Sequence, residues 1–511
     1  MRNLPTIRRD RTDQLIAIPF LVLLAVNTWH HALWSDELHA WGLVMASRNL
    51  MELFQNLHYE GHPGLWHLFL WFTGLLSRNA TTIQIVHLII AACLILIVAY
   101  QSPYTRVEKV LLLSNYFLVF EYTVLARNYG LAMLLALIYA KVRATMPERP
   151  ILVGFLLGAM ANTNVYGCVL AAFLALEYLW TGLIAAGWLA RAGVLGTLSG
   201  AGTFSALLLL CMVTVWPQPD ISNHPQQPMA GDPGALTRFG LQLLRTIVAP
   251  FFPVDFSFPI SFAFPGNIYS AGLRVWVSLA LLPLVCVALW TIFRDRPRFL
   301  LVLAGTALVA AGFAFAVYPS AIRHMGVVFV LFVTLLWIDR TTVPEPRSER
   351  LPERPAARAA VLGLLVLGAL GGGLALVGQW MRPFSIDGAV VAWLEEHAPP
   401  DVVLVGFPDM RTEPIAILMH KRFYALDCRC EDSYVRFLDR RDGFTAAMIP
   451  ERLEEALRLY RSKPLVLLAG APLDDTVRAA VRARGIVLTE RVHLEGAERD
   501  KEMTIFDVMP R

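Results

Sequence analysis

The sequence predicts a mainly α-helical, polytopic membrane protein with about 11 to 13 transmembrane helices and a C-terminal soluble α/β domain. Of its 511 residues, 56% are hydrophobic and only 16% are charged, whereas soluble domains carry about 25% charged residues. Apolar runs long enough to cross about 30 Å of hydrocarbon recur through the first three quarters. The clearest of these runs are residues 15–33, 82–100, 194–215, 273–293 and 360–380.

The distribution of basic residues predicts the topology. Arg8, Arg9 and Arg11 precede the first apolar run, which has no small-residue cleavage site and is therefore a retained helix with a cytoplasmic N-terminus. Further basic clusters mark cytoplasmic loops at residues 141–149, 191, 294–298 and 340–358. This arrangement gives a transmembrane domain over residues 1–382 and a domain on the outer side over residues 383–511. We expect a multi-pass protein of a bacterial inner membrane, with residues 383–511 in the periplasm. The arrangement also gives a first outer loop at 34–63 and a large outer loop at 216–272.

Two apolar segments conflict with this topology. Residues 63–76 and 82–100 both lie between the first outer loop and the basic stretch at Arg106 and Lys109. Two crossings would return the chain to the outer side. Either one segment does not span, the shorter being only about 21 Å long as a helix, or the loop at Arg106 is not cytoplasmic.

The C-terminal region alternates between strand-like and helix-like segments. Residues 402–407, 422–426 and 465–468 are strand-like, and helical patterns follow them at residues 412–420, 450–461 and 474–484. Such alternation favours a small open α/β domain with a parallel sheet. Because no glycine-rich phosphate loop follows any strand, we expect a structural or acceptor-docking domain rather than a nucleotide site.

Charge and cysteine content exclude other classes. The net charge of +4 is small, and the basic residues cluster between apolar runs, so we expect a lipid bilayer and no nucleic acid as partner. Cys428 and Cys430 are the cysteines in polar sequence. One intervening residue is a poor spacing for a disulfide, so we expect unpaired thiols.

Acidic and histidine residues gather in the first outer loop. Asp36 and Glu37 follow the first helix at the membrane boundary, where helix capping is a competing explanation. His58, Glu60 and His62 precede the next apolar run and match no specific zinc pattern. They are candidates for binding an acceptor or a metal ion.

Cationic and polar residues mark other predicted outer helix ends. Arg127 and Tyr129 adjoin apolar sequence, where an ionisable group is costly unless it is paired or functional. Arg323 and His324 offer groups able to bind a phosphate, although an arginine at a helix end also snorkels to the interface. Tyr166, with the nearby Asn162 and Asn164, either lines a sugar pocket or ends a helix, and we favour the second interpretation.

The order of these motifs resembles that of the GT-C glycosyltransferases. They are similar to the motifs of the branch that holds protein O-mannosyltransferases and the lipid A aminoarabinose transferase. The matching motifs are an Asp-Glu pair at Asp36, a Glu-x-His-Pro-Gly-Leu segment at residues 60–65 and an Arg-x-Tyr segment at residues 127–129. The clear resemblance covers residues 15–129. Gly64 departs from the pattern, because the branch usually has a second proline there.

The resemblance implies a GT-C-like fold and a polyprenyl-phosphate sugar donor in the outer leaflet, with an acceptor hydroxyl that attacks the anomeric carbon and inverts it. Asp36 would be the general base and Glu37 its catalytic neighbour. The donor phosphate would be bound by Arg127, Tyr129, Arg323 and His324. No cofactor is required for this chemistry, although a divalent metal ion is compatible with it.

Other functions are compatible with the same composition. In a transporter or lipid flippase, charged residues at helix ends would line a path, and paired inverted repeats would support that function. A glycan ligase using a pyrophosphate-linked donor would have more arginines than Arg238 and Arg245 in the large outer loop. In a third alternative, the soluble domain binds a partner and the helices are a scaffold.

Overall fold

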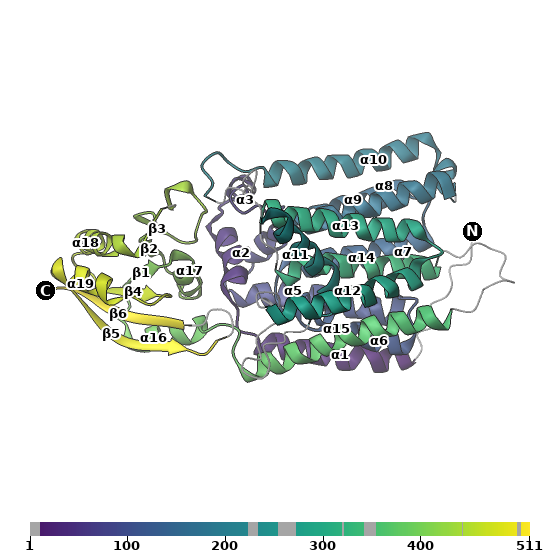
Figure 1. The fold of residues 1–511 in the computed structure, drawn as a ribbon. Coiled ribbons are helices and arrows are strands. Elements are labelled where there is room, and N and C mark those ends of the chain that lie inside the picture. The colour runs from purple at the N-terminus through teal and green to yellow at the C-terminus, as the bar shows by residue number, and fades with distance from the viewer. Residues whose placement is uncertain are drawn as a thin grey trace.

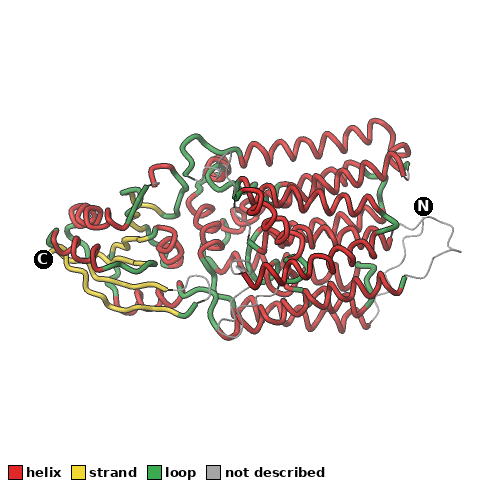
Figure 2. The backbone as a smooth tube through the Cα atoms, in the orientation of Figure 1, coloured by secondary structure: helices red, strands yellow, loops and turns green. Residues whose placement is uncertain are grey.

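The protein is an elongated helical bundle with a smaller sheet-containing domain at one end (Figure 1). The computed structural model describes residues 11–185, 187–222, 234–253, 272–318, 321–341, 354–441, 443–497 and 502–511. Parts of the predicted large outer loop, residues 223–233 and 254–271, lie outside the described residues. Figure 2 shows that the described strands all belong to the end domain.

Eight described helices are long and apolar enough to cross a membrane. They are α1 (Arg11–His30), α5 (Thr81–Gln101), α9 (Val165–Trp180), α10 (Trp188–Val215), α12 (Gly272–Phe293), α13 (Pro297–Ala316), α14 (Ile322–Thr341) and α15 (Pro355–Met381). Three shorter segments pack beside them, namely α6 (Arg106–Leu113) with the π-helical turn Phe117–Glu121, α7 (Asn128–Thr145) and α8 (Pro150–Ala161). Eight described helices thus have the length and hydropathy of a membrane crossing, and the number of 11 to 13 transmembrane helices stays a prediction.

The conflict over the apolar segments at residues 63–76 and 82–100 is resolved by their lengths. Residues 63–76 contain only the 10-residue helix α4 (Leu65–Gly74), which is too short to cross about 30 Å at about 1.5 Å per residue. Helices α2 (Ser35–Ala46) and α3 (Leu50–Leu57) lie at the end of the bundle that faces the sheet domain (Figure 1). Only α5 returns the chain to the far end, where α6 begins at Arg106. The alternative in which one of the two segments does not span is thus correct, and that segment is residues 63–76.

Helices α8 and α10 approach each other closely because glycines line their contact. A Cβ atom added at Gly200 would lie 2.5 Å from the carbonyl carbon and oxygen of Pro150. One at Gly154 would clash with the carbonyl oxygen of Gly200. Small residues of this kind allow membrane helices to pack backbone against backbone.

We expect Gly200→Leu to lower the thermal unfolding midpoint of the detergent-purified protein, because overpacking costs about 1–3 kcal/mol. Gly202→Leu, two residues along the same helix, is the matched control, since a Cβ atom there meets nothing within 4 Å. The midpoints are measured by the thiol or tryptophan signal on heating. Equal midpoints for the two variants would contradict the close contact between α8 and α10.

The C-terminal domain is built on a six-stranded sheet of order β3-β2-β1-β4-β6-β5. Its elements are α16 (Asp387–His397), β1 (Val403–Phe407), α17 (Asp409–Leu418), β2 (Phe423–Ala425), β3 (Cys430–Asp432), α18 (Ile449–Leu459), β4 (Leu465–Ala469), α19 (Asp475–Ala483), β5 (Ile486–Glu495) and β6 (Glu502–Pro510). Strands β2, β1 and β4 are parallel, as predicted. Strands β3, β6 and β5 are antiparallel additions, so the sheet is mixed rather than wholly parallel.

The expectation that Cys428 and Cys430 are unpaired is wrong, because a disulfide joins them. Arg429 between them adopts a left-handed conformation, with φ of 55°. That turn brings the two Cα atoms to 5.3 Å, within the usual range for a disulfide. The spacing alone does not reveal a backbone conformation that non-glycine residues seldom adopt.

The C-terminal domain packs directly on the first outer segment. Helix α17 contacts α2, where Ile417 and Tyr434 leave no room for a side chain at Gly42. Ile221, after α10, forms an isolated antiparallel bridge with Leu438. The remaining described helix, α11 (Ala235–Val248), packs against α12 and α13. The sheet domain is therefore attached to the segment that carries Asp36.

Candidate active site

Asp36 lies in the first turn of α2, at the end of the bundle that carries the sheet domain. Its Oδ2 atom is 2.9 Å from Nη2 of Arg323 and 3.9 Å from Nη2 of Arg127. Arg127 also donates a hydrogen bond to the backbone carbonyl of Asp36. The structure thus brings together a carboxylate and two guanidinium groups that the sequence places far apart.

Glu37 is fully buried and holds the start of α2 in place. Its Oε1 atom accepts a hydrogen bond of 2.5 Å from the backbone N–H of Ala126. Its Oε2 atom accepts from the backbone N–H of Trp34 at 3.2 Å and lies 2.9 Å from Nε2 of His31. Both oxygens are used inside the protein, so Glu37 ties the start of α2 to the backbone just before Arg127.

Charged side chains meet at this site in a partly dehydrated place. Arg127 and Arg323 are 11% and 13% exposed, and Asp36 is 26% exposed. Electrostatic interactions are stronger there than in bulk water, and the buried Glu121 also acts on Arg323 electrostatically. Helices α2, α7 and α14 all begin here, and a helix N-terminus favours an anion. The geometry suits a bound phosphate.

Aromatic rings form one side of the same site. His324 stacks on Tyr166 with ring centroids 4.8 Å apart, and its centroid lies 5.7 Å from that of Tyr129. The Nδ1 atom of His324 accepts a hydrogen bond from the backbone N–H of Ala321. Tyr122 donates to the backbone carbonyl of Arg323 at 2.6 Å. His324 is therefore held among rings, and its Nδ1 atom is used by the backbone of Ala321.

Tyr166 lies in the first turn of α9, as the helix-end interpretation predicts, and its ring also stacks on His324. Its hydroxyl is buried and makes no hydrogen bond with a described residue. The helix-end interpretation is also correct for its neighbours. Asn164 caps α9 by accepting from the backbone N–H of Gly167, and Asn162 donates to the carbonyl of Gly158.

The structure does not gather His58, Glu60 and His62 into one site. The Nδ1 atom of His58 lies 2.9 Å from the carbonyl oxygen of Trp216, whereas Glu60 pairs with His39. Burial, with a smaller effect from Arg127, lowers the pKa of His62 to about 4, so its ring is neutral. Among the described residues, three convergent metal-ligand atoms occur only in the C-terminal domain.

His39, which the sequence did not single out for a role, links the two parts of the chain. Its Nε2 atom lies 2.7 Å from Glu60, and its Nδ1 atom lies 2.8 Å from Glu413 of α17. Burial disfavours the charged ring, but the two carboxylates outweigh burial and hold the pKa of His39 well above its usual 6.5. A protonated His39 thus joins the sheet domain to the loop beside Asp36.

We expect the contact between α17 and α2 to depend on pH through His39. Because the folded-state pKa is raised, the stabilising effect is fully present below the unfolded value near 6.5 and is lost as pH rises through the folded value. Replacing His39 leaves two buried carboxylates without their cation, which costs about 3–5 kcal/mol. His39→Gln should therefore speed hydrogen exchange in α17 relative to the unmodified protein, most strongly near pH 6 and least at alkaline pH.

The matched control is His397→Gln, because His397 is an exposed histidine of the same domain. It should leave exchange in α17 unchanged at every pH. If His39→Gln and the unmodified protein differ by the same factor across the whole pH range, the charged form of His39 does not stabilise the contact.

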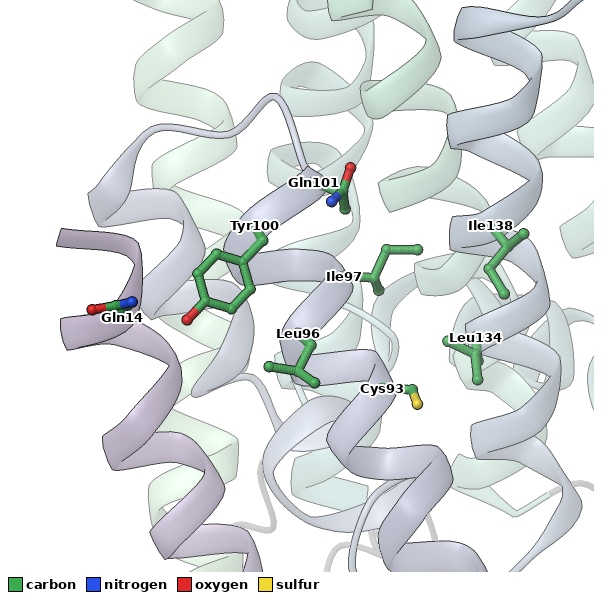
Figure 3. Close-up of a pocket in the computed structure, with 8 residues that line it drawn as sticks. All are labelled: Gln14, Cys93, Leu96, Ile97, Tyr100, Gln101, Leu134 and Ile138. Atoms are coloured by element: carbon green, nitrogen blue, oxygen red, sulfur yellow. The ribbon is translucent and has the colours of Figure 1, made fainter. Parts of the chain in front are cut away.

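A separate hollow of about 730 Å³ lies among α1, α5 and α7 (Figure 3). Most of its lining is apolar, with Gln14, Tyr100 and Gln101 as polar members. It contains no carboxylate and no guanidinium group. The hollow therefore lacks the groups that activate a hydroxyl or bind a phosphate, and the candidate site remains at Asp36.

Comparison with known proteins gives a match at the level of fold. No family model and no curated protein matches the chain. The crystal structure of ArnT from Cupriavidus metallidurans bound to undecaprenyl phosphate superposes with a TM-score of 0.52 at 12% identity, covering 96% of this chain and 97% of that one. Its apo state gives a TM-score of 0.50 with the same identity and coverage. The chain shares the ArnT fold, which confirms the predicted GT-C-like fold class.

Proposed function

We propose that this protein is a membrane glycosyltransferase that moves a sugar from a polyprenyl-phosphate carrier to an acceptor hydroxyl. The observation that carries the proposal is the meeting of Asp36 with Arg127 and Arg323 at one end of the bundle. The shared fold adds support, because ArnT has been solved with undecaprenyl phosphate bound. In the proposed orientation, this end and the sheet domain face the periplasm, and the N-terminus is cytoplasmic.

The arginines provide the donor site in this scheme. Without a substrate, Arg323 pairs with Asp36 at 2.9 Å. A phosphate offers negatively charged oxygens, and guanidinium groups bind phosphate oxygens in a bidentate manner. The phosphate would thus take over part of the pairing with Arg127 and Arg323, which leaves the carboxylate of Asp36 available for the acceptor.

Asp36 would activate the acceptor. The acceptor oxygen attacks the anomeric carbon, its proton passes to Asp36, and the bond between that carbon and the phosphate oxygen breaks. A positioned general base accelerates such a step about 10²–10⁴-fold. Attack from the side opposite the phosphate inverts the anomeric configuration. The arginines stabilise the charge on the departing phosphate, so the scheme requires no cofactor.

The test is a transfer assay with purified protein in liposomes that contain polyprenyl-phosphate sugars. The lipid and acceptor extracts come from cells that lack the gene. Mass spectrometry should show free polyprenyl phosphate appearing together with a sugar-modified acceptor, in equal amounts. The acceptor that gains mass identifies whether it is a lipid, a glycan or a protein.

Two other outcomes would replace the proposal. Donor that changes leaflet without losing its sugar would indicate a flippase. Release of polyprenyl pyrophosphate rather than polyprenyl phosphate would indicate a ligase with a pyrophosphate-linked donor.

A further inference from the structure

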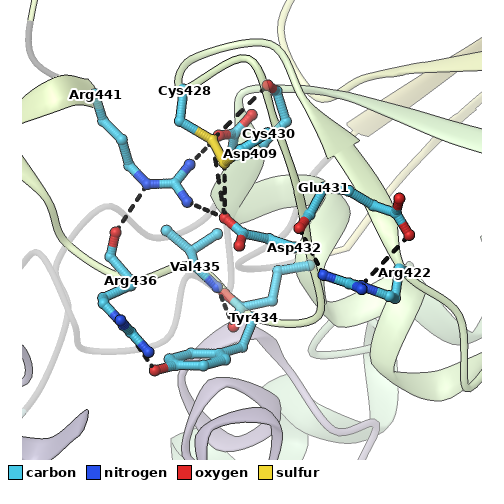
Figure 4. Close-up of polar contacts among 12 residues, drawn as sticks. Asp409, Arg422, Cys428, Cys430, Glu431, Asp432, Tyr434, Val435, Arg436 and Arg441 are labelled. Atoms are coloured by element: carbon cyan, nitrogen blue, oxygen red, sulfur yellow. Dashed lines mark hydrogen bonds and ion pairs between the residues drawn. A yellow bond between two sulfur atoms is a disulfide. The ribbon is translucent and has the colours of Figure 1, made fainter. Parts of the chain in front are cut away.

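The turn between strands β2 and β3 gathers two sulfur atoms and a carboxylate (Figure 4). Oδ2 of Asp432 lies 3.2 Å from Sγ of Cys430 and 3.8 Å from Sγ of Cys428. In the disulfide form neither sulfur carries a proton to donate, and a carboxylate only accepts. No hydrogen bond therefore joins the carboxylate to the sulfurs, and it is held beside them by its ion pair with Arg441.

Stabilisation of the fold is a weak explanation for this disulfide. In the chain-entropy account, a cross-link stabilises in proportion to the logarithm of the loop that it closes. Cys428 and Cys430 are two residues apart, so their loop is about as short as a loop can be. The intervening Arg429 is held at φ of 55°, a conformation that costs a non-glycine residue free energy.

We infer that this turn is a redox-controlled metal site, in which the reduced form binds a thiophilic divalent cation such as Zn²⁺. Its ligands are the thiolates of Cys428 and Cys430 and the carboxylate of Asp432. One ligand atom from each residue lies within 4.8 Å of the other two. Thiolate sulfur and carboxylate oxygen both bind zinc, and three protein ligands leave a fourth position for water.

Charge favours a cation once the disulfide is reduced. Arg441 pairs with both Asp409 and Asp432, and its Nε atom donates to the carbonyl of Arg436 at 2.8 Å. Its single positive charge is thus already shared by two carboxylates. Two thiolates add two negative charges to the same turn, which a divalent cation neutralises.

A dithiol reductant opens the site in this scheme. Two electrons and two protons pass from the dithiol to the sulfur pair, so the bond between the sulfurs breaks and two S–H groups form. The reductant leaves as a disulfide. Zn²⁺ then displaces the two thiol protons when it binds. The side chain of Asp432 is 23% exposed, so an ion has access to it.

The test uses the full chain in detergent with the bundle cysteines removed by Cys93→Ala, Cys168→Ala, Cys211→Ala and Cys286→Ala. One half of the sample is reduced with dithiothreitol and desalted without oxygen. Both halves then compete for Zn²⁺ with a chromophoric chelator. We expect about one bound ion per reduced chain and none per oxidised chain. Equal binding by the two halves would overturn the inference.

Asp432→Asn tests the carboxylate and should weaken Zn²⁺ binding by about tenfold or more in the reduced chain. Glu431→Gln is its matched control, because Glu431 is the preceding residue of β3 and pairs with Arg422 instead. Equal Zn²⁺ affinities for these two variants would show that Asp432 does not bind the ion.

A second measurement does not depend on any variant. In the reduced, unmodified chain, Zn²⁺ should protect Cys428 and Cys430 from maleimide, as read from the mass of the peptide that contains them. If both thiols react at the same rate with and without Zn²⁺, they do not bind the metal.

Discussion

Asp36→Asn should lower the rate of sugar transfer by about 10²–10⁴-fold while the affinity for polyprenyl phosphate stays the same or rises. Asparagine keeps the shape of the side chain but does not accept the acceptor's proton. It also removes the negative charge that lies 2.9 Å from Arg323. Two guanidinium groups would then face the phosphate without the competing carboxylate of Asp36. Initial rates in the liposome assay and binding of polyprenyl phosphate by calorimetry measure the two effects separately.

Glu52→Gln is the control for this substitution. Glu52 lies in α3, at the same end of the bundle, in an exposed ion pair with Arg48. Surface pairs of that kind contribute little to stability, so rate and affinity should both be unchanged. If Asp36→Asn keeps the full transfer rate, Asp36 is not the base. If it loses rate and phosphate binding together, the substitution has damaged the site as a whole.

Local sequence patterns predicted the parts of the fold that depend on one segment at a time. The long apolar runs identified the spanning helices, because about 20 apolar residues suffice to cross the membrane. The alternation after Pro383 predicted strands β1, β2 and β4. The antiparallel strands were missed, since the apolar residues of β5 are mostly only partly buried, with Leu488, Val492 and Leu494 packed at the margin of the core. The strand conformation of β5 depends on its antiparallel pairing with β6, which lies later in the sequence.

The candidate site was predictable in its residue types but not in its contacts. Asp36, Arg127 and Arg323 stood out because charged groups beside apolar sequence need a partner or a function. His39 did not stand out, since one of its partners, Glu413, is 374 residues away. Glu37 looked equivalent to Asp36 in the sequence. Only the fold shows that both of its oxygens are used by the backbone of Trp34 and Ala126 and by His31.

The orientation of α14 also required the fold. Its helix is buried along most of its length, from Ile322 to Ile338. A surface helix of similar composition would let an arginine near its end snorkel into water. The surrounding helices instead hold Arg323 against Asp36, and the carbonyl of Arg323 accepts a hydrogen bond from Tyr122. The same sequence pattern therefore gives a largely buried ion pair with Asp36 here.

Arg323→Gln should reduce the transfer rate by about 10²–10³-fold, because the guanidinium stabilises the charge that develops on the departing phosphate. Arg323→Lys keeps the charge but loses the planar fork, so we expect an intermediate rate. The relevant measurement is kcat together with the affinity for polyprenyl phosphate. A larger loss in kcat than in ground-state binding is expected, since the phosphate gains charge as the bond to the sugar breaks.

The control for both arginine variants is Arg382→Gln. Arg382 follows α15 at the same end of the bundle and is exposed. It should leave kcat unchanged, which would separate the local effect of Arg323 from a general loss of positive charge near the membrane. If Arg323→Gln weakens phosphate binding but leaves kcat unchanged, the guanidinium recruits the carrier but does not assist bond breaking. Arg127 would then be the arginine on which stabilisation of the leaving phosphate depends.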